Sequence, residues 1–466
     1  MAVYKLVHFS SLSHTKRMDA EYYSPRFEPV LRKLGLLNTV KLKHILVEPV
    51  KTGHTPSMKN SSYYKPKAVK FIKTDNLRED IINTHDIQYL SEIGNSKISR
   101  SELRIDDVIL TIIGATEDII GRAARVSSNL GRANINQNIA LIRSRLPAGY
   151  LVTFLNSYYG REQLIRLSRQ TGQVNLNCRE VEELSVPLFT DKFIFTVHNL
   201  NNQRHNLVLQ SEQMYAKAEQ LLLSELGLHD WKPRHTLTYV RSFSQVKQAN
   251  RMDAEHFQPK YKEMFDRLPS SVHLQPLGKI SIYTKGIEVG SSAYTDSGIP
   301  FWRVSNLSKY GLADDTVNFI SNELYNILRV NYEPQQGEIL LSKDATPGIA
   351  YYLEKPVQGI VSSGILRLLL IDNIPPHYLE LVLNSLFVQL QIDQNVGGSI
   401  IKHWKPSEVH KTLIPRLSNG KEKEIAELVQ QSHTARREAK NLLEKAKRAV
   451  ETAIEEGEER ALEFLS

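Results

Sequence analysis

The chain has 466 residues, which at roughly 100–200 residues per domain is enough for two to four structural units. Its composition, 41% hydrophobic and 24% charged, excludes a wholly disordered chain, and no apolar run approaches the roughly 20 residues that span a bilayer. A single cysteine excludes an intrachain disulfide and a zinc site with several thiolates. The N-terminal residues lack a continuous apolar stretch, so a cytoplasmic location is expected.

The positive charge is concentrated at one end of the chain. The net charge is +8, and residues 1–187 contain 27 Lys and Arg against 18 Asp and Glu. Residues 188–234 balance at 5 and 5, residues 235–415 at 17 and 17, and residues 416–466 contain 10 against 11. A polyanionic partner is favoured, contacted most strongly by the first segment.

Strand-like and helical patterns alternate along the chain. Helical patterns occupy residues 150–168 and 378–393. Residues 373–377, Asn-Ile-Pro-Pro-His, predict a turn that leads into the second of these helices. The predicted strands cover residues 69–72, 108–113 and 139–142 in the first part, then 299–304, 338–341 and 365–370 in the second.

The two parts are copies of one another. Three blocks of sequence recur in the same order, with differences in residue number of 234, 228 and 221 between the two copies of the first, second and third block. This indicates an internal duplication. The matched blocks are residues 17–21 with 251–255 (both Arg-Met-Asp-Ala-Glu), 150–187 with 378–415, and 211–222 with 432–443. Because the Arg-Met-Asp-Ala-Glu unit precedes both modules, a structural junction with the helices is favoured over a carboxylate-pair active site.

Each copy ends in a heptad pattern free of internal proline, over residues 200–228 and 421–464. Small and polar seam residues indicate two weak helices that stabilise each other as an antiparallel pair; the alternative is that each lies on its own module. The seam comprises Arg204, Leu207, Ser211, Met214, Ala218 and Leu221 in the first helix, and Ile425, Leu428, Ser432, Ala435, Ala439, Leu442, Ala446, Ala449 and Ala453 in the second.

The predicted fold class is therefore α+β. We expect two tandem mixed α/β domains, separated by two long helices that form an antiparallel coiled coil, with a pseudo-twofold internal repeat. The expected segments are residues 1–187 (first domain), 188–234 (central spacer helix), 235–415 (second domain) and 416–466 (C-terminal spacer helix).

Motifs of several enzyme classes are absent from the sequence. It contains no G-x-x-x-x-G-K-[ST], H-E-x-x-H or G-x-S-x-G, and Ile374 interrupts the Asn-Pro-Pro-aromatic tetrapeptide of amino methyltransferases. No histidines or cysteines have metal-ligand spacing, so no catalytic, cofactor or metal residues are predicted. The absence of these motifs is typical of a protein that recognises and binds its target without catalysing a reaction.

The ordered, repeated segments resemble the specificity subunit of type I restriction–modification systems over nearly the whole chain. Residues 171–188, TGQVNLNCREVEELSVPL, are similar to that family's closing motif, although the second copy, residues 397–417, lacks Asn-Leu after its glycines. The remaining similar segments are FIKTDNL (71–77), FWRVSNL (301–307), DDVILTIIGAT (106–116) and GEILLSKDATPGIAY (337–351).

This resemblance implies a subunit without catalysis of its own that recognises a split double-stranded DNA target through two target-recognition domains. Two modification subunits, which use S-adenosylmethionine to methylate adenine, and ATP-dependent restriction subunits that translocate and cleave DNA are the implied partners. No cofactor is expected on this chain. The alternatives are a DNA methyltransferase or nuclease with a divergent active site, and a coiled-coil scaffold that binds only proteins.

Candidate DNA-binding residues lie in polar loops at matching places in the repeat. Lys and Arg bind guanine edges or phosphates, and Asn and Gln bind adenine edges; Asn76 and Asn306 are alternatively backbone caps, and Trp404 is either a stacking residue or buried. The first set is Lys51, Thr52, His54, Lys73, Asp75, Asn76, Arg122, Asn136, Gln137, Asn138, Gln170, Gln173 and Asn175, and the second is Lys285, Arg303, Ser305, Asn306, Lys343, Asp344, Ser362, Ser363, Ser399, Lys402 and His403.

Overall fold

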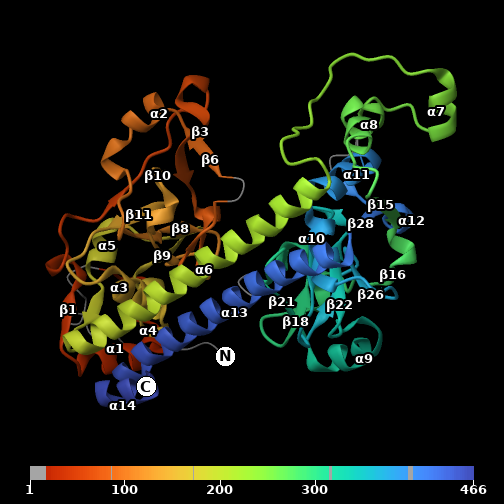
Figure 1. Ribbon diagram of the computed structural model, residues 1–466. Coiled ribbons are helices and arrows are strands. Elements are labelled where there is room, and N and C mark those ends of the chain that lie inside the picture. The colour runs from red at the N-terminus through yellow and green to blue at the C-terminus, as the bar shows by residue number, and fades with distance from the viewer. Residues whose placement is uncertain (1–16, 85–86, 172, 314–316, 397–401, 466) are drawn as a thin grey trace. The chain divides into compact units, whose positions relative to one another are not determined.

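The computed structural model describes residues 17–84, 87–171, 173–313, 317–396 and 402–465. These residues belong to two compact units (Figure 1). Unit 1 consists of Met1–Leu209 with Arg437–Ser466, and unit 2 consists of Gln210–Arg436. Both boundaries fall inside long helices, α6 (Asp191–Glu225) and α13 (Asn419–Glu456), so each of these helices contributes one half to each unit.

Unit 1 is a mixed α/β structure that contains several small sheets. The four-stranded sheet has the order β2-β11-β7-β9 and is antiparallel. One three-stranded sheet has the order β10-β3-β6 with β10 parallel to β3, and the other has the order β12-β13-β8. Its elements before α6 are α1 (Glu28–Gly35), β1 (Thr39–Lys41), β2 (Lys51–Thr52), β3 (Tyr64–Ile72), β4 (Leu77–Arg78), β5 (Ile81–Ile82), β6 (Gln88–Leu90), α2 (Glu92–Ser96), β7 (Val108–Thr111), β8 (Ile113–Gly114), β9 (Ala123–Arg125), β10 (Ala133–Ile135), β11 (Ile139–Ile142), α3 (Ala148–Asn156), α4 (Tyr158–Leu167), β12 (Arg169–Thr171), β13 (Gln173–Asn175), α5 (Cys178–Glu182) and β14 (Ser185–Pro187).

Unit 2 repeats this topology. Two of its sheets have the orders β16-β26-β22-β24 and β17-β21-β18-β25, with β25 parallel to β18. They match the β2-β11-β7-β9 and β10-β3-β6 sheets of unit 1 strand for strand apart from the extra β17. Its elements are α7 (Phe243–Ala249), α8 (Pro259–Asp266), β15 (His273–Pro276), β16 (Ser281–Lys285), β17 (Tyr294–Thr295), β18 (Ile299–Trp302), β19 (Leu307–Ser308), β20 (Gly311–Leu312), β21 (Asn318–Ile320), α9 (Asn322–Tyr332), β22 (Glu338–Ser342), β23 (Asp344–Ala345), β24 (Ala350–Tyr352), β25 (Ile360–Val361), β26 (Ile365–Leu370), α10 (Pro376–Asn384), α11 (Leu386–Val396), β27 (Lys402–His403), α12 (Pro406–Lys411) and β28 (Leu413–Arg416).

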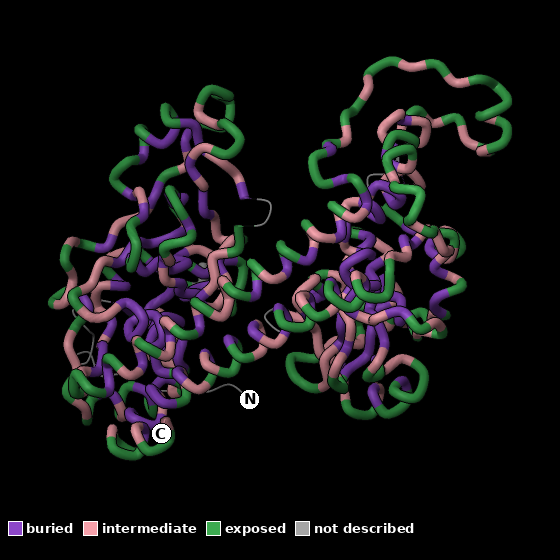
Figure 2. The backbone as a smooth tube through the Cα atoms, viewed as in Figure 1, coloured by how far each residue is buried: buried purple, intermediate pink, exposed green. Residues whose placement is uncertain are grey.

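Continuous apolar runs form the buried centre of each unit. Every residue of β7, β22 and α3 is buried, as expected for segments covered on all sides (Figure 2). In contrast, the segment that carries α7 is largely exposed, with Leu237 and Val240 each 90% accessible. No helix in the described ranges combines the length and the apolar character needed to cross a bilayer.

The duplication is visible in side-chain contacts as well as in topology. The hydroxyl of Tyr150 donates to the carbonyl of Pro187, and that of Tyr378 donates to Pro415, each at 2.7 Å. In the same way, the amide of Asn156 bonds to the backbone of Ala123 and the amide of Asn384 to that of Ala350. Equivalent residues therefore make equivalent hydrogen bonds in the two copies.

Each single helix predicted after the sheets is in fact two helices. The break falls at Ser157 in unit 1, where α3 ends and α4 begins, and at Ser385 in unit 2, between α10 and α11. The Ser157 hydroxyl donates to the carbonyl of Phe154 and accepts from the amide of Gly160, so one side chain both ends a helix and starts the next.

The two long helices begin before the predicted heptads, at Asp191 and Asn419, and end before the predicted heptads do, at Glu225 and Glu456. Within unit 2, Ser211 and Ser432 are hydrogen-bonded at 3.0 Å and Glu225 pairs with Lys421 at 3.4 Å, so the helix segments run in opposite directions there. Arg204, which the heptad spacing assigns to the seam, instead donates to Asp80. The C-terminal segment is also not one helix, because α13 ends at Gly457, whose φ of 101° is left-handed, before α14 (Glu458–Leu465).

Candidate nucleic-acid interface

In unit 1, backbone contacts bring three of the candidate loops together. The first loop lies directly on the β10–β11 connection, since a Cβ on Gly53 would stand 1.8 Å from the carbonyl oxygen of Ile135. Beside it, the amide of Asn136 donates to the carbonyl of Ile72, which immediately precedes Lys73. The loops at residues 51–54, 73–76 and 136–138 therefore share one edge.

A fourth stretch, on β13, is attached to the same edge through the end of β7. The amide of Ile112 donates to the carbonyl of Asn138 at 2.9 Å, and the amide of Leu176 donates to the carbonyl of Ile112 at 2.8 Å. Asn175 is paired with Ile113 in the β13–β8 ladder and is exposed. The side chains of Gln170 and Gln173, from the same hairpin, lie outside the described residues.

The unit 1 candidates differ in accessibility. His54, Asp75, Gln137 and Asn175 are exposed, Lys51, Thr52, Lys73, Asn76 and Asn138 are half-buried, and Arg122 and Asn136 are buried. Arg122 is held inside the unit, where its Nε donates to the carbonyl of Asp118, and the side-chain oxygen of Asn136 accepts from the amide of Asn138. These two side chains shape the loops in this structure.

Unit 2 assembles its loops through matching contacts. Gly286 takes the place of Gly53: a Cβ there would lie 2.2 Å from the carbonyl oxygen of Ser362. The amide of Ser362 donates to Trp302, and the amide of Lys343 donates to the carbonyl of Gly364. The β23–β27 pair then joins Asp344 to His403, so the loops at 285–287, 303–306, 343–344, 362–364 and 402–403 form one continuous set.

Asn76 and Asn306 confirm the capping alternative. The Asn76 side-chain oxygen accepts from the amide of Lys73 at 2.9 Å, and its nitrogen donates to the carbonyl of Asn83. Asn306 makes the same two bonds, to Arg303 and Ala313. Both residues therefore fix the short turns at Thr74–Asn76 and Val304–Asn306, which present Lys73 and Arg303 at equivalent positions.

A charged cluster lies at the centre of the unit 2 loops. Lys343 and His403 both pair with Asp344, the His403 Nδ1 at 2.9 Å. Partial burial would raise the pKa of Asp344, but the hydrogen bonds from Lys343 and His403 outweigh it and lower that pKa. Nearby, the Lys402 ammonium pairs with Asp393 at 2.8 Å. The His403 side chain remains 65% accessible and is the most open member of the cluster.

Other unit 2 candidates range from open to enclosed. Lys285 and Ser305 are exposed, Ser363 is half-buried and donates to Glu288, and Ser362 is buried. Ser399 lies outside the described residues. Trp404 is 1% exposed, which confirms burial rather than stacking.

Sequence reasoning did not single out three exposed lysines between the first and second candidate loops of unit 1. Lys59, Lys65 and Lys67 follow the first candidate loop and are all exposed. The sequence feature that could have identified them is a series of lysines just before the apolar, buried end of β3, Val69–Ile72.

The repeated Arg-Met-Asp-Ala-Glu unit is a structural clamp, and its partner differs from the one expected. Arg17 pairs with Asp19 and donates to the carbonyls of Leu167 and Ser168. Arg251 likewise pairs with Asp253 and donates to Asn395. These side-chain bonds thus join the unit to the C-terminal ends of α4 and α11, and the carboxylates of Asp19 and Asp253 are each paired with the arginine of the same unit.

Comparison with known proteins finds similarity to a specificity subunit of a type I restriction enzyme. No protein-family model matches the chain. A stretch of 160 residues, 33% of this chain, is 23% identical to the specificity subunit of the type I restriction enzyme EcoBI from Escherichia coli, and it spans 30% of that relative's length. This match confirms the resemblance to specificity subunits that the sequence motifs indicate.

Solved structures of the same class align over most of the chain, at low similarity. The S subunit of a type I restriction–modification system from M. genitalium aligns at a TM-score of 0.41 and 12% identity, covering 90% of this chain and 96% of that one. The HsdS subunit from Thermoanaerobacter tengcongensis aligns at a TM-score of 0.30 and 16% identity, covering 90% and 97%.

Proposed function

We propose that this chain is the sequence-specific DNA-binding subunit of a type I restriction–modification system, with no catalysis of its own. It recognises a split target, one half through each copy of the repeated domain. The two recognition domains are residues 1–187 and 235–415, and the spacer helices are residues 188–234 and 416–466.

The observation that carries this proposal is a polar loop platform built twice on one topology. In each unit a glycine allows the first loop to lie on backbone carbonyls, an asparagine caps the second loop, and a cation precedes that cap. Duplicated scaffolds with different loop residues suit a protein that reads two different half-sites, because the scaffold fixes the loops while their side chains vary.

Exposed and half-buried loop residues are the proposed DNA contacts, and the buried ones position the loops. The cations bind phosphates or guanine, and the amides read adenine. We assign contact roles to Lys51, Thr52, His54, Lys73, Asp75, Gln137, Asn138, Gln170, Gln173 and Asn175 in the first domain and to Lys285, Arg303, Ser305, Lys343, Asp344, Ser363, Ser399, Lys402 and His403 in the second. Lys59, Lys65 and Lys67 extend the first set. Asn76, Asn136 and Arg122, with Asn306 and Ser362, hold the loops in shape.

The long helices are proposed to form an antiparallel coiled coil that spaces the two domains in a pseudo-twofold arrangement. The Ser211–Ser432 and Glu225–Lys421 contacts support this pairing. Two modification subunits that use S-adenosylmethionine, and restriction subunits that use ATP, are the proposed partners. Their absence would leave DNA binding without methylation or cleavage.

Selection from random DNA tests the proposal. The purified chain, with an adenine methyltransferase partner co-expressed if needed for solubility, is incubated with a pool of random duplexes, and bound DNA is sequenced. We expect enrichment of two short fixed sequences separated by a spacer of fixed length. Enrichment of no sequence would contradict the proposal and favour a protein-binding scaffold.

A second assay addresses the enzymatic alternative. The chain alone, incubated with S-adenosylmethionine and the selected duplex, is expected to transfer no methyl group. Methyl transfer or strand cleavage by the chain alone would favour a divergent enzyme instead.

A further inference from the structure

Two histidines and a glutamate form a buried cluster in unit 2, between α10 and the first half of α13. One carboxylate oxygen of Glu380 lies 2.9 Å from His377 Nδ1, and the other lies 2.9 Å from His433 Nε2. Glu380 is 0% exposed, His433 2% and His377 6%. The three ligand atoms lie within 4.8 Å of one another. Two histidines, of which His433 is 53 positions from Glu380 in the chain, thus meet around one carboxylate.

Hydrogen bonding alone leaves this cluster with unbalanced charge. The other nitrogen of His377, Nε2, lies 2.9 Å from a carboxylate oxygen of Glu354. Because carboxylates only accept, a cation-free cluster requires protons on both nitrogens of His377. His433 Nδ1 is buried without a hydrogen-bond partner among the described residues, so in the cation-free cluster the single proton of a neutral His433 lies on Nε2, where Glu380 accepts it. One imidazolium then faces two carboxylates, one of them fully enclosed.

We propose that this cluster is a binding site for a divalent transition-metal ion of the zinc type. The ligands are His377 Nδ1, the Glu380 carboxylate and His433 Nε2, and a water molecule completes the coordination. Two imidazoles with one carboxylate form a ligand set that suits zinc, at roughly 2.0–2.2 Å from each donor atom, after small side-chain rotations. The ion takes the place of the proton on His377 Nδ1, the proton of His433 moves from Nε2 to Nδ1, and the two charges of the ion balance Glu380 and Glu354.

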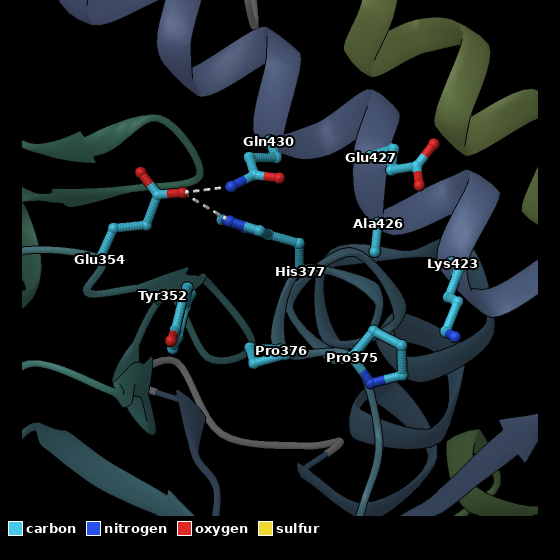
Figure 3. A pocket seen from close by; sticks show the side chains of 9 residues that line it. All are labelled: Tyr352, Glu354, Pro375, Pro376, His377, Lys423, Ala426, Glu427 and Gln430. Atoms are coloured by element: carbon cyan, nitrogen blue, oxygen red, sulfur yellow. Dashed lines mark hydrogen bonds and ion pairs between the residues drawn. The ribbon is translucent and has the colours of Figure 1, made fainter.

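Glu354 is a positioning residue in this site. By accepting from His377 Nε2, it fixes the ring with Nδ1 directed at the ion, an arrangement in which a carboxylate orients a metal-bound histidine. Figure 3 shows His377 and Gln430 both directed at Glu354, with Lys423 on the neighbouring helix. These residues line a pocket of about 430 Å³, which lies beside the Glu354 and His377 end of the cluster.

The site is a property of the second copy alone. At the offset of 228, extended by one residue before the 150–187 and 378–415 blocks, the positions of His377 and Glu380 are occupied by Gly149 and Val152. At the offset of the third block, the residue equivalent to His433 is Glu212. The first copy does have one histidine in a related place: His198 on α6 accepts from the amide of Gly149 at 3.1 Å. That histidine provides a matched control. The bound ion would fasten α13 to α10 within unit 2.

Metal binding to the full chain tests the proposal, independently of any DNA activity. The protein, purified without a histidine tag and stripped with a chelator, is titrated with Zn²⁺ by calorimetry. One saturable site is expected in the unmodified chain and in His198→Gln, and none in Glu380→Gln or His433→Gln. Glu354→Gln should bind roughly 10–100-fold more weakly, the usual effect of removing a carboxylate that orients a metal-bound histidine.

Two further measurements keep the test decisive if a variant folds poorly. Co²⁺ added to the unmodified chain should produce the visible absorption of low-symmetry nitrogen and oxygen coordination, displaced by Zn²⁺. Zn²⁺ should also raise the unfolding temperature of the unmodified chain and of His198→Gln, but not that of Glu380→Gln. Absence of saturable binding by the unmodified chain, or equal binding by folded His433→Gln, would overturn the proposal.

Discussion

At the scale of single residues, one buried ion pair fastens a loop of unit 1 to α6. Asp80 is fully enclosed, and its Oδ2 accepts from Arg204 and from the amide of Asn201, each at 2.7 Å. Arg204 is only 3% exposed and also donates to the carbonyl of Asp80. Such a pair adds little net stability compared with apolar residues, but removing one partner leaves the other charge buried.

Asp80→Asn should lower the free energy of unfolding of unit 1 by about 3–5 kcal/mol, since Arg204 would lose its counter-charge in a buried place. Urea unfolding measures the change. Asp106→Asn is the matched control, because Asp80 and Asp106 both have left-handed backbones, with φ of 49° and 69°, that asparagine adopts readily. Asp106 pairs with Arg125 at an exposed site, so its replacement should cost less than about 1 kcal/mol. Equal effects would contradict the burial argument.

Acidity should weaken the same contact. Burial would raise the pKa of Asp80, but Arg204 and His205 outweigh it and lower that pKa to about 2. Because the pKa is depressed below the unfolded value of roughly 3.9, the contribution is complete above pH 4 and is lost as the pH falls towards 2. The stability difference between the unmodified chain and Asp80→Asn, measured by urea unfolding from pH 6 downwards, should therefore shrink by roughly 2–3 kcal/mol. A difference independent of pH would show that Asp80 is not the titrating group.

At the scale of elements, periodicity predicted the strands well and the helix breaks poorly. The predicted strands at residues 139–142 and 365–370 coincide with β11 and β26, because their apolar runs are continuous and buried. The break at Ser157 was not predicted, since the flanking residues keep helical periodicity and only the serine's double hydrogen bond interrupts it.

The candidate DNA-binding site was also predictable only in part from the sequence. Which loops are polar was readable from the sequence, but how they meet was not, because contacts such as Gly53 on Ile135 join residues far apart in the chain. For the same reason, the spacing of His377, Glu380 and His433 gave no metal-ligand signal. Short-range caps, such as Asn76 on Lys73, were within reach of sequence reasoning because they span three residues.

A methyl group on Gly53 should disturb the loop platform of unit 1. In Gly53→Ala the Cβ would meet the Ile135 carbonyl at 1.8 Å, so β2 and its loop must shift away from the β10–β11 connection. We expect a lower unfolding temperature of unit 1 and loss of recognition of one half-site, with the other half retained in a random-DNA selection. Gly35→Ala, which meets no atom within 4 Å, should leave both properties unchanged. Unchanged recognition of both half-sites by Gly53→Ala would show that the contact between Gly53 and Ile135 is not needed for DNA recognition.

At the scale of the whole molecule, the uneven charge predicts how binding responds to salt. Each phosphate contact contributes about −0.9 to the slope of log affinity against log salt concentration. Lys73→Glu, in the basic first segment, should flatten that slope by about one contact in fluorescence anisotropy titrations. Lys217→Glu, an exposed lysine on α6 in the balanced segment, should leave it unchanged. An equal change in both variants would indicate a general effect of net charge rather than a local contact.

The long helices allow a direct test of the proposed spacing between half-sites. The unit boundaries fall at Leu209 and Gln210 in α6 and at Arg436 and Arg437 in α13, so one heptad inserted at each point lengthens both helices without altering either unit. Seven residues keep the seam in register and add about 10.5 Å, which corresponds to roughly three base pairs of B-DNA.

Those base pairs also rotate the second half-site by nearly a third of a turn around the duplex. The doubly lengthened chain should therefore select the same two half-site sequences with a longer spacer, or lose binding through the rotational mismatch. A heptad inserted in α6 alone is the control, because it shifts the two helices out of register and should destabilise the chain. An unchanged spacer at full affinity in the double insertion would show that the helices do not determine the distance between half-sites.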